Sequence, residues 1–167
     1  MKSLIRSNVN FSKINQFFFA GKATLTFLNR EKGTHMTVKI KQIKDRKDRK
    51  TLLPIFYVFV SIVGDQEYGF RFAGTIFKET MTYKLGRDVK EGDQLEKIMK
   101  FFMRALSNPD PLKTRVSLLH EGSCCRCSRK LTHPESIDTG FGPECLEIIL
   151  SQSKMKASDL FEKLGGE

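Results

Sequence analysis

All four cysteines of the chain lie within residues 120–145, and this clustering restricts how the C-terminal part can fold. Cys124 and Cys127 have the Cys-x2-Cys spacing of a knuckle whose two thiolates face one metal ion. Cys145 follows a Gly-Phe-Gly-Pro sequence, in which the glycines permit a tight reversal and the proline suits the first turn of a helix. A thiolate is favoured at the N-terminus of such a helix. These cysteines therefore predict one metal site.

The fourth ligand is predicted to be a histidine, and two positions are open. His120 precedes the knuckle with three residues between, and His133 follows it with five. Pro134 stiffens the chain directly after His133, in a run typical of a turn, so we favour His120. Cys125 is a poor candidate, because its neighbours already define the knuckle and its side chain should point away. The predicted cofactor is one structural zinc ion, held by His120, Cys124, Cys127 and Cys145.

The same segment resembles a small zinc-finger-like domain of unknown function that is common in phage and prophage proteins. The resemblance covers roughly residues 120–146 and rests on several motifs in order: a preceding His, the Cys-x2-Cys knuckle, Arg-Lys-Leu-Thr, Pro-Glu-Ser-Ile and Gly-x-Gly-Pro-Glu-Cys. The chain departs from the pattern at Ser128, where Gly is usual, and at Cys125, where a small residue is usual. The resemblance implies a phage-type protein with a zinc site, and it carries no activity.

The length and composition are those of a soluble globular protein. The chain has 167 residues, 40% of them hydrophobic and 29% charged, which suffices for one core and a small metal-binding module. No apolar run approaches the length needed to cross a bilayer, and the N-terminus lacks the apolar region of a secretory signal. Clustered cysteines favour metal binding in a reducing compartment. We therefore expect a cytoplasmic protein, in the host cytoplasm if it is phage-encoded.

Residues 1–108 are predicted to form a β-rich α+β domain with a mostly antiparallel sheet. Apolar and polar residues alternate over 22–27 and 36–41, as in two half-buried strands of a hairpin. Residues 55–63 are apolar on both faces, which predicts a central strand covered on each side. Further strands are expected over 68–77, with a bulge or a close backbone approach at Gly74, and over 81–85.

An amphipathic helix should close the first domain. Asp93 is a candidate N-cap, Glu96 would complete a capping box, and apolar residues recur at helical spacing up to Leu106. The Asn-Pro-Asp-Pro turn that follows marks a boundary, so residues 109–167 are predicted to form a zinc-binding, treble-clef-like module with a helical tail. Most of the phenylalanines lie at core-like positions. Phe17–Phe19 and Phe70 are the ones to test for exposure.

The net charge of +10 favours a polyanionic or acidic partner, which means nucleic acid or an acidic host protein surface. The charged run over residues 44–50 is either a phosphate-gripping finger or a solvated turn, and we favour the turn because two aspartates dilute five bases. The candidate binding residues are Lys39, Lys41, Arg46, Lys47, Arg49 and Lys50 in the first domain and Arg126, Arg129 and Lys130 around the knuckle.

The chain is not expected to be an enzyme. It has no phosphate-binding P-loop, no His-Glu-x-x-His helix and no Gly-x-Ser-x-Gly turn. A zinc-dependent hydrolase would need an open coordination position and a nearby general base. We expect an accessory protein that binds nucleic acid mainly through phosphate contacts. The alternative is a protein-binding module that inhibits a host factor or a defence complex. No membrane association is expected, and the oligomeric state is not predicted.

Overall fold

The protein has an α+β fold built on one antiparallel sheet of seven strands, in the order β1-β7-β2-β3-β4-β5-β6. The computed structural model describes residues 7–47, 54–62, 69–131 and 134–153. The strands are β1 (Ser7–Val9), β2 (Lys22–Asn29), β3 (His35–Lys47), β4 (Pro54–Ile62), β5 (Arg71–Phe77), β6 (Thr82–Leu85) and β7 (Val116–His120). The helices are η1 (Phe11–Lys13), α1 (Ile14–Phe18), α2 (Gln94–Ser107), α3 (Pro134–Thr139) and α4 (Pro143–Ser153).

Strands β2 to β6 follow one another as antiparallel neighbours, which confirms the predicted hairpin and the strands that follow it. The alternation of apolar and polar residues along β2 and β3 decides which side chains face the helices. Leu25 pairs with Val38 on the buried face of the sheet, and Thr24 pairs with Lys39 on the opposite face. The predicted bulge near Gly74 is present as a register shift in the pairing of β4 with β5. A Cβ at Gly74 would lie 2.4 Å from the carbonyl oxygen of Lys84, so the strands approach closely there.

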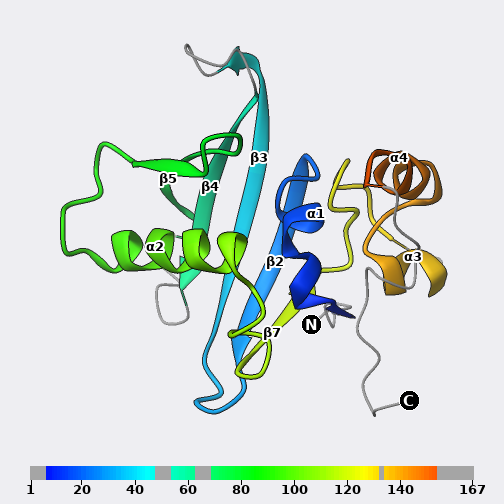
Figure 1. Ribbon diagram of the computed structural model, residues 1–167, viewed down its shortest axis with the longest axis horizontal. Coiled ribbons are helices and arrows are strands. Elements are labelled where there is room, and N and C mark those ends of the chain that lie inside the picture. Colours follow the sequence, from blue (N-terminus) through cyan, green and yellow to red (C-terminus); the bar gives the residue numbers. More distant parts are fainter. Residues whose placement is uncertain (1–6, 48–53, 63–68, 132–133, 154–167) are drawn as a thin grey trace.

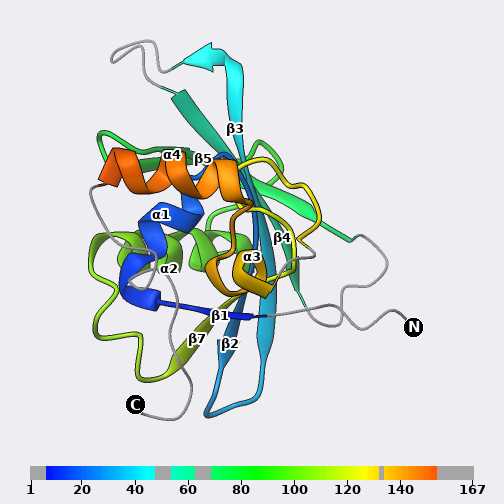
Figure 2. The same ribbon diagram turned by 90° about the vertical axis from the view of Figure 1, so that its right-hand side faces the viewer.

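Helices α1 and α2 cover one face of the sheet (Figures 1 and 2). The apolar side of α2 packs on the strands as its helical spacing predicts, and the Phe102 ring lies 5.6 Å from Phe18 and 5.3 Å from Phe27 between centroids. The predicted capping box does not form. The Asp93 carboxylate accepts a hydrogen bond from the Lys90 backbone instead, and Glu96 pairs with Lys100, one turn further along the helix.

The opposite face of the sheet corrects one prediction. No helix in the described part of the chain lies over it (Figures 1 and 2), so β4 is covered on one side only, and Tyr57 and Phe59 are half-buried rather than enclosed. A strand that is apolar on both faces is predicted to be buried on both, but the described part of the chain places helices over one face only. Phe17–Phe19, the candidates for exposure, are all buried, and Phe17 and Phe18 belong to α1.

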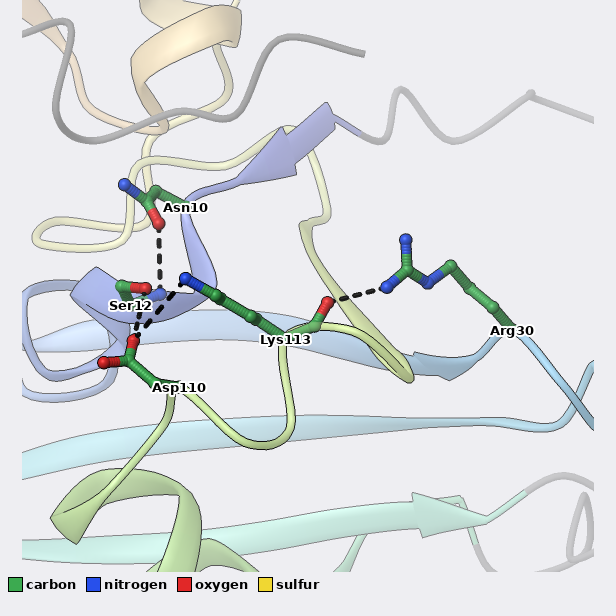
Figure 3. A network of polar contacts seen from close by, with 5 residues as sticks. All are labelled: Asn10, Ser12, Arg30, Asp110 and Lys113. Carbon is green, nitrogen blue, oxygen red and sulfur yellow. Dashed lines mark hydrogen bonds and ion pairs between the residues drawn. The ribbon is translucent and has the colours of Figure 1, made fainter. Parts of the chain in front are cut away.

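The sheet continues across residue 109, where the module boundary was predicted. Strand β7 lies between β1 and β2 and pairs with both. Side chains hold the preceding turn in place (Figure 3): Asp110 accepts a hydrogen bond from Ser12 at 2.9 Å, and the Lys113 carbonyl accepts one from Arg30 at 2.6 Å. The part of the chain that stands beside the sheet therefore begins after His120, with α3 and α4 at the β1–β7 side (Figure 1).

Two predictions concern segments at the edge of what the structure describes. The charged run is predicted to be a loop or an extended hairpin tip, and its first half extends β3 as far as Lys47, which pairs with Pro54 of β4. The predicted last helix, from residue 157, lies outside the described residues. Among the described helices, none has both the length and the apolar composition to span a membrane.

Candidate metal centre

Three cysteine thiols converge at the end of the sheet. The sulfur atoms of Cys124, Cys127 and Cys145 all lie within 4.8 Å of one another. Cys124 and Cys145 are buried and Cys127 is exposed, so the cluster lies just beneath the surface. Three soft donors this close repel one another as thiolates unless a cation sits between them, which makes the group a candidate metal centre.

The knuckle is shaped by its backbone. Ser123 and Lys130 form an antiparallel bridge, the Cys124 amide donates to the Arg129 carbonyl at 2.8 Å, and the Ser128 amide donates to the Cys124 carbonyl at 2.8 Å. These bonds turn the chain so that the first and last cysteines of the Cys-x2-Cys segment face the same point. Ser128 adopts φ 64°, the left-handed region that favours glycine. Glycine is the usual residue here in the domain that the segment resembles.

Cys125 anchors the knuckle to the rest of the protein and takes no part in the thiol group. Its carbonyl accepts a hydrogen bond from the Lys22 amide at 2.9 Å, and its amide donates to the Gly140 carbonyl at 3.0 Å. Its side chain is fully buried, and burial raises the pKa of the Cys125 thiol well above its ordinary value. A thiol that stays protonated in an apolar site packs as a small hydrophobic residue.

Cys145 is supplied by the first turn of α4, two residues after Pro143. The Arg126 guanidinium donates to the Cys145 sulfur over 3.6 Å. Burial raises the pKa of the Cys145 thiol, whereas the pKa of Cys127 is lowered: burial opposes this, but hydrogen bonds from the Arg129 backbone and the neighbouring thiols outweigh it. The arrangement favours the thiolate at Cys127 over that at Cys145, and a bound cation would favour the thiolate at each of its ligands.

His120, the predicted fourth ligand, lies outside the thiol group and has other partners. Its Nδ1 accepts a hydrogen bond from the Gly122 amide at 3.0 Å, and its Nε2 donates to the Ile137 carbonyl. The ring is fully buried, and burial lowers the pKa of His120, which keeps the ring neutral as this bonding pattern requires. In this geometry His120 ties the end of β7 to α3 and to the start of the knuckle. His133, the alternative, lies outside the described residues.

The predicted basic residues fall into two described groups. Arg126 is half-buried against Cys145, whereas Arg129 and Lys130 are exposed on the knuckle. Lys39 and Lys41 are exposed on β3 and point away from the helices. Arg46 and Lys47 belong to the end of β3, and their side chains lie outside what the structure describes, as do residues Arg49 and Lys50 altogether.

Sequence reasoning missed two surface features. The first is the open face, defined as the outward positions of β2 to β6 on the side without helices, where aromatic residues lie among lysines. The sequence signal for the open face is the set of aromatic residues in β4 and β5, whose spacing is equally typical of a core. The second is a groove of about 760 Å³ between the β2–β3 turn and α2. It is lined by apolar residues with Lys32, His35 and Lys97, and no carboxylate is among its lining residues.

The comparisons with known proteins found a similarity only for the segment that contains the candidate metal centre. A family model described as a family of unknown function (DUF6011) matches residues 118–149, which include all three thiols of the group. A search of curated proteins and a search of solved structures each found no match. The matched segment begins within β7 and ends within α4, so the knuckle and the helix that completes it are similar to one family unit.

Proposed function

We propose that the protein is a non-enzymatic, phage-type accessory protein in which a structural zinc ion organises the knuckle and a basic surface binds nucleic acid. The observation that carries the proposal is the group of three thiols directly beside exposed cationic side chains of the same turn. Clustered reduced cysteines suit the cytoplasm, which would be the host's cytoplasm for a phage-encoded protein.

The thiol group fits zinc in its donor chemistry and in its size. Zinc takes thiolate ligands at about 2.3 Å in a tetrahedron, which corresponds to sulfur atoms roughly 3.8 Å apart. The three sulfurs lie within 4.8 Å of one another, so small side-chain movements would close the site. When bound, zinc would supply a fixed positive charge that holds the knuckle on α4. Two of the three thiols are buried, and no described carboxylate or histidine belongs to the group, so a structural role fits better than a hydrolytic one.

The fourth ligand is tested by two histidine variants. His120 would have to give up its bonds to Gly122 and Ile137 to reach the metal, so we expect His120→Ala to destabilise the fold while the metal keeps its coordination. His133→Ala is the matched variant. Cobalt substituted for zinc reports the ligand set through its visible absorption. A spectrum that changes only in His133→Ala would assign the fourth ligand to His133, and a change only in His120→Ala would restore the original prediction.

The basic surface extends from the knuckle onto the sheet. The Lys22 amide is hydrogen-bonded to Cys125, and the Lys22 side chain lies opposite Lys41 in the pairing of β2 with β3. The backbone of the turn that carries Arg129 and Lys130 is therefore joined to the strand that carries Lys22. Lysine and arginine contacts to phosphate would supply most of the affinity, with little dependence on base sequence.

The experiment is a titration of labelled single-stranded and double-stranded oligonucleotides with zinc-loaded protein across a series of salt concentrations. Micromolar or tighter binding that weakens steeply with salt is the expected result, since phosphate contacts release counterions. The absence of binding at low salt, despite a net charge of +10, would reject the nucleic-acid proposal and favour the alternative, a module that binds an acidic host protein.

A further inference from the structure

The open face brings aromatic and cationic side chains into two adjacent rows. The pairing registers place Lys22, Lys41, Tyr57, Thr75 and Lys84 side by side in one row across β2 to β6. The next row holds Thr24, Lys39, Phe59 and Phe72. Because adjacent strands are about 4.8 Å apart, lysines flank the aromatic residues on β4 and β5 at a distance of one or two strands.

The aromatic residues form one continuous surface. The Phe72 ring lies 5.3 Å from Tyr57 and 5.3 Å from Phe59 between centroids. Phe70 extends this surface, with the Lys39 ammonium 4.2 Å from its ring centroid. Phe70 and Phe72 are 37% and 38% exposed, the large apolar side chains that the described part of the chain leaves most open to solvent. Such a patch on a sheet face usually marks a binding surface.

The charge of the open face selects the kind of partner. Four lysines occupy its outward positions, and none of its described side chains is a carboxylate. Glu121, which follows β7, accepts a hydrogen bond from the Thr26 hydroxyl at the margin of the face. A surface that combines aromatic rings with lysines is complementary to a flexible polyanion that carries exposed planar groups.

We infer that the open face binds single-stranded nucleic acid, with bases stacked on Tyr57, Phe59 and Phe72 and phosphates held by the flanking lysines. The inference rests on the proposed function and specifies its substrate. A duplex keeps its bases stacked inside the helix, so it could use the lysines but not the rings. Stacking on aromatic side chains tolerates any base, which predicts weak sequence preference. The knuckle adjoins the Lys22 end of the row and would extend the phosphate track.

The test compares matched substitutions on the two faces of the sheet, using zinc-loaded protein and fluorescence anisotropy. The probes are a labelled thymidine or uridine homopolymer and a duplex of the same length. Phe72→Leu removes a ring from the open face. Phe101→Leu makes the same change at a half-buried position of α2. Lys41→Gln removes an open-face charge, and Lys97→Gln removes an exposed charge from α2. Thermal melting of each variant reports whether it remains folded.

The expected result has three parts. Phe72→Leu weakens single-strand binding on the order of ten-fold, as for the loss of one stacked base, and leaves duplex binding unchanged. Lys41→Gln weakens the binding of both the single strand and the duplex. For the single strand it lowers the slope of log K against log salt concentration by about 0.7, the value for one phosphate contact. Phe101→Leu and Lys97→Gln bind like the parent protein.

Two results would overturn the inference. Equal affinity for single strand and duplex, with Phe72→Leu binding like the parent, would leave the proposed nucleic-acid function standing and remove the open face from it. A stable dimer in sedimentation that dissociates on Phe72→Lys substitution would show that a second copy covers the face instead. If the parent protein bound neither the single strand nor the duplex, the proposed function itself would be rejected.

Discussion

The sheet and the knuckle are stabilised by different physical means. The sheet packs against α2 through large aromatic and aliphatic side chains, and Phe18, Phe102 and Met99 have no exposed surface. Of the described residues between Cys125 and the start of α3, only Leu131 is a buried large side chain. Backbone hydrogen bonds shape the knuckle and bring its thiols close to that of Cys145. Apolar burial contributes about 1.5–3 kcal/mol for each large side chain, whereas the knuckle has little to bury.

The comparison predicts that the knuckle would depend on a bound metal ion for its stability and that the sheet would not. A short segment without an apolar core needs another source of stability, and metal binding is itself folding free energy in such modules. Variants that remove a thiol, a core ring or a backbone constraint should therefore affect the two regions differently. They should differ in how much stability is lost and in whether metal binding or the unfolding of the sheet changes.

The largest expected effect is that of Cys124→Ser. It should release the metal and unfold the knuckle and α4, since structural zinc contributes on the order of 10 kcal/mol in small zinc modules. Metal analysis and amide hydrogen exchange would show the loss in the knuckle while β3 and β4 stay protected. Cys125→Ala is the matched control and should retain the metal. Parent protein purified with less than half an equivalent of metal would refute the dependence.

Phe102→Ala should destabilise the sheet by about 3–5 kcal/mol, because it removes a fully buried ring and leaves a cavity beneath α2. Denaturant unfolding measures the loss. Metal content should stay at the parent value until the whole protein unfolds. Phe101→Ala, at a half-buried position of the same helix, should cost less. Metal loss from folded Phe102→Ala would mean that the two regions are not separable.

Gly140→Ala tests the junction between the regions. Gly140 has φ 79°, and an added Cβ would lie 3.1 Å from the Phe17 ring and 3.4 Å from His120. We expect a loss of about 1–3 kcal/mol from backbone strain and crowding. Gly142→Ala is the control two residues on, where an added Cβ would meet nothing within 4 Å. Equal melting temperatures for the two variants would argue against a tightly packed junction.

The smallest effect should be a gain. Ser128→Gly relieves the left-handed conformation of the knuckle turn and should stabilise the metal-loaded protein by about 1 kcal/mol. The effect should appear in metal affinity, measured by competition with a chelator, because the turn positions Cys124 and Cys127. Ser151→Gly, within α4, is the opposite control and should destabilise its helix by a similar amount.

Several elements could be predicted because their signal is local. Alternation over β2 and β3, the apolar spacing of α2 and the Cys-x2-Cys segment each specify a structure within a short window. Helix α4 begins at Pro143, as the Gly-Phe-Gly-Pro sequence predicts. The local sequence did not predict that the capping box at Asp93 fails to form, because the Asp93 carboxylate accepts a hydrogen bond from the Lys90 amide in the preceding turn.

The sequence by itself determined the α+β class, the order of the β2–β6 strands along the chain and the convergence of the three thiols. Only the tertiary structure decided that β7 lies between β1 and β2, that His120 is bonded to Gly122 and Ile137, and that one face of β4 is open. The reason is physical. Periodicity reports which residues are apolar, whereas pairing between distant strands and the side on which helices pack depend on long-range contacts. An aromatic strand enclosed on both faces and one that offers a ring surface to a ligand have the same pattern of residues.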